Sequence, residues 1–304
     1  MPAEPVDSGI NPESEYLIVI GDIQVYTSSP EANVFYVKTI EWMIEQYSRG
    51  LKIESVLQVG DVTENNKPAL WNNFKTATSD IATMIPYFVC TGNHDYDWGE
   101  RAAIPDRSST HINEYCHFRL SDSRIVEYYE GNSLENYVAA LPEEIGASLL
   151  VLEFGPRTEV VRWAKNYVEK HKDKRFILMT HEWLTTAGER ISTGSYAERQ
   201  FKGYSTYSSP EELWESLVKP NDNIVCVLCG HNGFSAKLFS ENDAGREVPQ
   251  ILFNLQYQEN GGNGLVQLWE FPQGSEYVNI CCYDTFNRDW YMPDSTSVSF
   301  KFRY

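Results

Sequence analysis

Five apolar segments of this chain each end in polar side chains that can bind a metal ion or transfer a proton. The segments are YLIVIGDIQ, SVLQVGDVT, YFVCTGNHD, RFILMTHEW and NIVCVLCGHNG, and their terminal polar residues are Asp22, Gln24, Asp61, Asn93, His94, Asp95, His181 and His231. Continuous Val/Ile/Leu-rich runs of this length are typical of buried β-strands. We therefore expect five strand ends to bring these side chains to one edge of a sheet, where they form a single site.

Amphipathic segments alternate with these predicted strands. A helix is predicted within residues 29–50 and another within 157–174, because apolar residues recur there near the 3.6-residue period. The predicted apolar faces are Val34, Val37, Ile40, Ile44 and Tyr47 in the first helix and Val160, Trp163, Ala164, Tyr167 and Val168 in the second. Ser209 and Glu212 have the spacing of a capping box and start a third helix. Strands that alternate with helices indicate an α/β sandwich.

After His231 the pattern changes to short strands separated by turns such as ENGGNG and PQGS. We expect these strands to form a β-meander that completes a second sheet. No linker separates them from the preceding residues, so we predict a single domain over residues 16–304. Residues 1–15 are polar and Pro-containing, which predicts a flexible tail.

The charge balance excludes some classes of partner. The chain has 43 acidic against 25 basic residues, a net charge of -18 and a pI near 4.7. Binding to a nucleic-acid backbone depends on Lys and Arg that replace counterions, so no such binding is expected. No apolar run approaches the roughly 20 residues of a membrane helix, so no membrane span is expected.

The six cysteines do not predict a disulfide framework, which is typical of short secreted chains. Cys226 and Cys229 have zinc-finger spacing, but a strand would direct them to opposite faces, so we expect no zinc site there. The sequence is consistent with two cellular locations. The linker-like opening favours an extracytoplasmic location, whereas buried unpaired cysteines fit the cytoplasm as well.

The polar blocks resemble those of a known family. Taken in order, GDIQ, GDVT, GNHD, a later His and GHNG resemble the blocks GDxH, GDxx, GNH(D/E), His and GHxH of the calcineurin-like metallophosphoesterase superfamily, over residues 21–233. A GD pair alone is a weak signal, but GNHD in order with the other four is a strong one. The resemblance implies an α/β fold, a four-layer α/β/β/α sandwich of two mixed sheets flanked by helices.

By matching positions, the resemblance implies one intact metal site. Asp61 would bridge two cations, and Asn93, His181 and His231 would complete the ligands of one of them. Two cations roughly 4 Å apart can hold a hydroxide, orient a phosphoryl group and neutralise its growing charge. The implied cofactor is one or two divalent ions, which could be Mn, Fe, Zn or Mg.

The second implied metal site lacks two imidazoles. Gln24 replaces the family histidine of the first block and Gly233 that of the last, which leaves Asp22, Gln24 and Asp61. An all-oxygen ligand set favours hard ions over Zn²⁺ and predicts weaker or different occupancy. Other amides follow soon after His231 and could fill the gap, or could be ordinary strand and turn residues; these are Asn254, Gln256 and Gln258.

His94 matches the family position proposed to protonate the leaving oxygen, and Asp95 would orient its ring. The implied function is metal-dependent hydrolysis of phosphate mono- or diesters by attack of metal-bound hydroxide, with His94 as general acid. The presence of both residues favours an active enzyme. The alternative is a catalytically weak or inactive module of the same fold that binds a phosphorylated or glycan ligand, which the two missing imidazoles favour.

Two insertions, residues 96–110 and 185–209, are expected to shape substrate choice. Their candidate contacts are Tyr96 and Trp98, which could stack on a ring, and Arg101, Arg190, Arg199 and Lys202, which could hold a phosphate. Each is equally explained as an ordinary loop residue. The expected partner is a small phosphorylated substrate or phosphoester, and the oligomeric state is left open.

Overall fold

The computed structural model describes residues 6–98, 105–203, 205–293 and 296–303. Within these residues the chain forms two seven-stranded mixed sheets and a separate two-stranded ladder. The first sheet contains β1 (Glu15–Ile20), β2 (Lys52–Gln58), β3 (Tyr87–Val89), β13 (Leu265–Phe271), β14 (Tyr277–Asp284), β15 (Asp289–Tyr291) and β16 (Val298–Lys301). The second contains β6 (Ile125–Tyr128), β7 (Tyr137–Ala140), β8 (Ser148–Val151), β9 (Phe176–Met179), β10 (Ile224–Cys229), β11 (Phe234–Glu241) and β12 (Glu247–Asn254). The ladder pairs β4 (Asp97–Trp98) with β5 (Pro105–Asp106).

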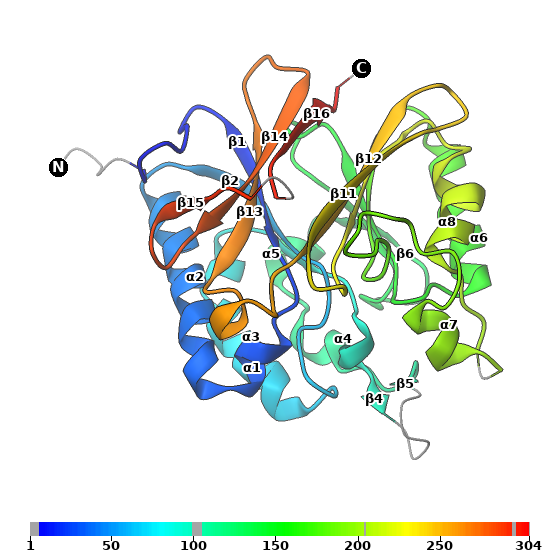
Figure 1. Ribbon diagram of the computed structural model, residues 1–304, viewed down its shortest axis with the longest axis horizontal. Helices are drawn as coiled ribbons and strands as arrows, with labels where there is room; N and C mark the ends of the chain where they lie inside the picture. The colour runs from blue at the N-terminus through cyan, green and yellow to red at the C-terminus, as the bar shows by residue number, and fades with distance from the viewer. Residues whose placement is uncertain (1–5, 99–104, 204, 294–295, 304) are drawn as a thin grey trace.

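Helices cover the outer face of each sheet. The α-helices are α1 (Gln24–Ser28), α2 (Pro30–Ser48), α3 (Pro68–Thr78), α4 (Ile112–Tyr115), α5 (Arg119–Asp122), α6 (Thr158–Lys170), α7 (Tyr196–Phe201) and α8 (Pro210–Leu213). The 3₁₀ helices are η1 (Ile81–Thr83), η2 (Asn93–Asp95) and η4 (Glu259–Gly261), and η3 (Trp214–Val218) is a π-helical turn. Figure 1 shows α1, α2 and α3 outside the first sheet and α6 and α8 outside the second. None of the described helices has the length and apolar character needed to cross a bilayer.

The two sheets pack against each other through alternate side chains of their strands. In β9, Ile177 and Met179 belong to the core cluster shared with the first sheet, whereas Leu178 belongs to the cluster under α6. This period of two follows from the opposite directions of successive side chains in a strand. The predicted four-layer α/β/β/α sandwich is therefore confirmed.

The strands that carry the polar blocks run parallel within each sheet. β1, β2 and β3 are adjacent and parallel, and so are β9 and β10. The sequence analysis expected one sheet edge, but three of the five strand ends belong to the first sheet and two to the second. The site therefore lies where the carboxyl ends of both sheets meet.

The apolar face of α2 differs from the predicted one. Ser29 accepts the N–H of Ala32 as N-cap, and Pro30 occupies the first turn, as the sequence suggests. The side chains buried against the sheet include Tyr36 and Trp42, whereas Val34 is 51% exposed. Aromatic side chains bury more apolar area than valines, so they determine which side of the helix faces the core.

The C-terminal strands divide between the two sheets, whereas we expected them all in the second. β11 and β12 extend the second sheet beside β10, but β13 pairs antiparallel with β1 and leads β14–β16 into the first sheet. The N-terminal segment also differs from the expected flexible tail. From Asp7 onward it is attached to the domain, because the Asp7 carboxylate accepts from Trp42 Nε1 at 2.8 Å and from Tyr283 Oη at 2.8 Å.

Candidate metal centre

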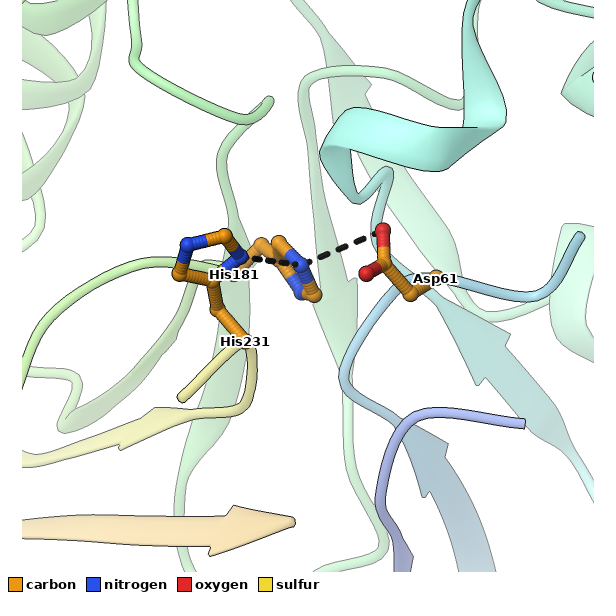
Figure 2. A group of neighbouring side chains, drawn as sticks. All are labelled: Asp61, His181 and His231. Carbon is orange, nitrogen blue, oxygen red and sulfur yellow. Dashed lines mark hydrogen bonds and ion pairs between the residues drawn. The ribbon is translucent and has the colours of Figure 1, made fainter. Parts of the chain in front are cut away.

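Three side chains from separate strand ends converge on one point. Asp61 follows β2, His181 follows β9 and His231 follows β10, and one ligand atom of each lies within 4.8 Å of the others. In Figure 2 the His181 ring lies between the other two. Its Nε2 is 3.2 Å from Asp61 Oδ1 and 3.3 Å from His231 Nδ1. All three side chains are buried, and they form a group from both sheets that could hold a metal ion.

A backbone carbonyl determines which nitrogen of His181 faces the site. Nδ1 lies 2.7 Å from the carbonyl oxygen of Val59, which can only accept, so Nδ1 carries a hydrogen. Neutral His181 therefore directs the lone pair of Nε2 toward Asp61 and His231. Burial lowers the pKa of His181, but the carboxylates of Asp61 and Asp22 outweigh it and raise the pKa to about 10. The surroundings thus favour positive charge beside Nε2.

Three polar atoms around this point are buried and have no hydrogen-bond partner among the described residues. They are Gln24 Oε1, Asn93 Oδ1 and His231 Nε2. Leaving such a group unsatisfied costs about 1–3 kcal/mol each, so a cluster of three needs an explanation. Gln24, Asn93 and His231 line the same cavity of about 140 Å³, together with Asp61 and His94. Oxygen and imidazole donors around one polar cavity fit a divalent cation.

The turn after β3 depends on a close approach to Asp61. A Cβ atom at Gly92 would lie 2.1 Å from Asp61 Oδ1, so only glycine allows this contact. The N–H of His94 donates to the same oxygen at 3.0 Å. Asp61 has a φ of 48° and His231 a φ of 69°, which are left-handed conformations unusual for residues other than glycine. Such strain costs about 1–3 kcal/mol per residue and clusters at functional sites.

The predicted role of Asp95 as the partner of His94 is corrected by the structure. The carboxylate beside the His94 ring belongs to Glu64, whose Oε1 lies 3.0 Å from Nδ1. Asp95 instead accepts backbone N–H groups, from Gly92 and Thr63 at 2.9 Å each. It therefore joins the loops after β2 and β3. Sequence analysis missed Glu64, although it lies three residues after Asp61.

The charges around His94 favour its protonated form. Burial lowers the pKa of His94, but the carboxylates of Asp61 and Glu64 outweigh it and raise the pKa to about 9. Since Nδ1 faces Glu64, the other ring nitrogen is left to face the cavity that His94 lines. The geometry and the raised pKa therefore favour a protonated His94 ring at the edge of the cavity.

Replacing Glu64 with glutamine tests this contact. We expect kcat to fall about tenfold, less than the loss of a whole general acid, with metal content unchanged. Because the carboxylate raises the pKa of His94, the alkaline limb of the pH–rate profile moves to lower pH in the variant. An unchanged profile in Glu64→Gln, combined with a shifted one in Asp95→Asn, would restore the original assignment to Asp95.

Asp22 lies behind the cavity in a group of hydrogen-bond donors. Its Oδ1 accepts from the N–H of His231 at 3.1 Å, and its Oδ2 accepts from Asn254 Nδ2 at 2.6 Å and Gln256 Nε2 at 3.2 Å. Gln24 Nε2 donates to Asp61 Oδ2 at 3.1 Å. Asn254, Gln256 and Gln258 were the candidates to fill the altered site. Asn254 and Gln256 contact Asp22, and Gln258 lies at the N-terminus of η4.

The structure corrects two of the predicted substrate contacts. Tyr96 is fully buried, and its hydroxyl lies 2.9 Å from Thr91 Oγ1. Arg190 forms an ion pair with Glu211 at 2.7 Å and covers the ring of Trp214. Both side chains are therefore occupied by structural contacts. Arg101 lies outside the described residues.

Two predicted contacts do lie near the cavity. The ring of Trp98 is 5.4 Å from that of His94, and Arg199 covers the ring of Tyr196 at 4.0 Å. Lys202 is exposed beside Glu198. The aromatic residues that line the cavity, Tyr196 and Tyr257, were not predicted. Tyr196 lies in a segment with other aromatic residues, and Tyr257 lies in a polar turn without a metal-binding or catalytic motif, so the sequence gives no signal for either.

A partly buried acid, Glu135, is connected to the site through a chain of contacts. Phe154 packs at 6.0 Å against the rings of both His181 and His231, and its N–H donates to Thr91 Oγ1. Thr91 contacts Tyr96, whose hydroxyl donates to Glu135 at 3.3 Å. Burial, together with the nearby Glu153 carboxylate, raises the pKa of Glu135 to about 7.

This raised pKa predicts a pH-dependent stability. A folded-state pKa of about 7 against an ordinary value of 4.5 means that the Glu135 contribution is fully present below pH 4.5 and is lost as pH rises through 7. Glu135→Gln cannot ionise. At pH 8 its free energy of unfolding should therefore exceed that of wild type by on the order of 2 kcal/mol, and at pH 5 the difference should be smaller. Urea unfolding at both values measures this, with exposed Glu127→Gln as control. A variant no more stable at pH 8 would contradict the argument.

Comparisons with known proteins identify a family for this chain. A family profile described as calcineurin-like phosphoesterase matches residues 16–244. An uncharacterized protein, YvnB of Bacillus subtilis, is 26% identical over 283 residues, which cover 89% of this chain and 20% of that protein. A probable inactive purple acid phosphatase 9 of Arabidopsis thaliana is 30% identical over 84 residues, which cover 27% of this chain and 13% of that protein. The chain thus spans about a fifth or less of the length of these relatives.

Solved structures with a similar arrangement are distant. A predicted phosphoesterase of Streptococcus pneumoniae has 10% identity and a TM-score of 0.39, covering 95% of this chain and 98% of that one. The NAD nucleotidase of Haemophilus influenzae has 12% identity and a TM-score of 0.42, covering 93% of this chain and 50% of that one. Because the family profile covers most of its length, the chain belongs to the calcineurin-like phosphoesterase family.

Proposed function

We propose that this protein is a metal-dependent hydrolase of phosphate mono- or diesters. The observation that carries the proposal is the set of three unpaired buried atoms, on Gln24, Asn93 and His231, around one cavity that Asp61 and His94 also line. Asp61, Asn93, His181 and His231 would hold the cation. A divalent cation there would place positive charge beside a phosphoryl oxygen and make water more acidic.

The remaining steps belong to side chains of the chain itself. His94, held by Glu64 at Nδ1, supplies a proton to the leaving oxygen of the ester. The pKa of Asp61 lies below its ordinary value, because the imidazoles of His181 and His94 outweigh the effect of its burial. Asp61 therefore stays ionised as a ligand.

The cavity limits how much of a substrate can enter. Its volume of about 140 Å³ is well below the roughly 300–1,000 Å³ of pockets that enclose a whole small molecule. It therefore fits the phosphoryl group, and the rest of the substrate lies at the mouth. Tyr196 and Tyr257 line the cavity and are 43% and 71% exposed, so they offer aromatic surface for the leaving group.

A direct assay separates phosphoester hydrolysis from the alternative, a binding module without turnover. Protein stripped with a chelator and reloaded with Mn²⁺, Fe²⁺, Zn²⁺ or Mg²⁺ should release p-nitrophenol from p-nitrophenyl phosphate or bis-p-nitrophenyl phosphate, with the stripped protein as control. Gln24 and Gly233 in place of histidines, and relatives named probable inactive phosphatases, favour a binding module for a phosphorylated or glycan ligand. No turnover with any of the metals would support that module and reject the enzyme.

A further inference from the structure

We propose that this chain binds a single divalent cation, because side-chain amides of Gln24, Asn254 and Gln256 occupy the carboxylate oxygens that a second cation would need. The inference rests on the proposed function only in that a cation binds. It concerns Asp22 and Oδ2 of Asp61, which lie on the side of the site where the two family imidazoles are absent.

The orientation of Asn254 is determined by the backbone. Its Oδ1 accepts the N–H of Gln256 at 3.0 Å, and its Nδ2 donates to the carbonyl of His231 at 3.1 Å. Exchanging the two ends of the amide would place donor against donor and acceptor against acceptor. Asn254 therefore presents Nδ2, a donor without ligand capacity, to Asp22 at 2.6 Å.

Asp22 is satisfied by the protein itself. The carboxylate is 3% exposed and accepts from Asn254, Gln256 and the N–H of His231. Together these three donors satisfy both oxygens of the carboxyl group. A cation bound at Asp22 would have to displace these donors, whereas the atoms of Asn93 and His231 that face the intact site have no partner to displace.

The two oxygens of Asp61 have different surroundings. Oδ1 faces His181 Nε2 at 3.2 Å, and Oδ2 accepts from Gln24 Nε2 at 3.1 Å. A carboxylate that bridges two cations needs one oxygen for each. Oδ1 also accepts the N–H of His94 at 3.0 Å, but its other neighbour, His181 Nε2, is an atom that can bind a metal, whereas the neighbour of Oδ2 is an amide donor. Asp61 therefore serves the cation on the Oδ1 side.

A single segment fills the place of the absent ligand at position 233. A Cβ atom at Gly233 would lie 2.2 Å from Cδ2 of Tyr257, so the tyrosine ring takes the space of a side chain there. Tyr257 directly follows Gln256, and Asn254 ends β12. Residues 254–257 thus supply two amide donors and one ring, none of which is a metal ligand in this arrangement.

Counting bound ions tests the proposal without measuring activity. We expect one Mn²⁺ or Zn²⁺ per chain by elemental analysis and by calorimetric titration of chelator-stripped protein. Mn²⁺-loaded protein should show the electron paramagnetic resonance signal of an isolated ion. Two tightly bound ions per chain, or a spin-coupled Mn²⁺ pair, would overturn this inference and leave the proposed function standing. No bound ion would overturn both.

A gain of metal in a variant tests the role of the amides. The double variant Gln24→His, Asn254→Asp removes one amide donor from Asp61 and one from Asp22 and puts a side chain that can bind a metal at each position, so we expect the folded variant to bind two ions per chain. Asn260→Asp, which adds the same charge at an exposed position of the following turn, should still bind one. Circular dichroism checks that both variants are folded. A folded double variant that binds one ion would show that the amides of Gln24 and Asn254 do not exclude the second.

Discussion

Asp61→Asn abolishes stoichiometric metal binding and lowers kcat for p-nitrophenyl phosphate by about 10³-fold or more, a loss of about 4 kcal/mol of transition-state stabilisation. The reason is that Asp61 supplies the only carboxylate oxygen in the converging group formed with His181 and His231 among the described residues. Asparagine keeps the shape but loses the charge that holds a cation beside the two imidazoles. Elemental analysis and steady-state kinetics measure the two effects.

The control for Asp61→Asn must separate metal loss from loss of folding. Asp61 also accepts from Gln24 Nε2 and from the N–H of His94, so the variant has a weakened turn after β3. Thermal unfolding followed by circular dichroism identifies a variant that is folded at the assay temperature. Asp80→Asn, at an exposed position after α3, should keep both metal and activity. A folded Asp61→Asn protein with full metal content would remove Asp61 from the ligand set.

His94→Ala leaves metal content unchanged and lowers kcat by about 10²- to 10⁴-fold, the usual contribution of a general acid. The side chain of His94 lines the cavity, but it is not one of the three converging ligands. Its loss therefore removes a proton donor without removing a metal ligand. Inductively coupled plasma analysis and kcat on the same preparation measure both quantities.

The leaving group gives a sharper version of this test. An alkyl alcohol leaves as a strong base and needs the proton, whereas p-nitrophenolate leaves without it. The rate loss in His94→Ala should therefore be larger for an alkyl phosphate than for p-nitrophenyl phosphate. His111→Ala, which removes a histidine paired with Glu114, is the matched control and should have little effect. Equal losses for both substrates would argue that His94 contributes charge and not a proton.

Local sequence patterns were sufficient for the elements that deliver the site. Each of the five apolar runs forms a strand, because runs of Val, Ile and Leu without polar interruption are stable only when buried on both faces. Because each strand runs through the core, the polar residues that follow it emerge at its carboxyl end. The capping box of Ser209 and Glu212 is present at α8, since its contacts span only three residues.

The pairing of distant strands was not accessible to such patterns. β13 lies beside β1 although 244 residues separate the two elements, from Ile20 to Leu265. The apolar residues of β13 indicate a buried strand, but not the sheet to which it belongs. In the same way the period of α2 predicts a helix, and only the sheet beneath it decides that Tyr36 is buried and Val34 exposed.

The sequence by itself predicted the set of donors, because Asp61, Asn93, His181 and His231 each lie within four residues of the end of a buried strand. Only the tertiary structure decided how neighbouring polar groups are used. Glu64 rather than Asp95 faces His94, since backbone N–H groups surround Asp95. Asn254 directs its nitrogen and not its oxygen toward Asp22, because two backbone groups far from Asp22 in sequence orient its amide.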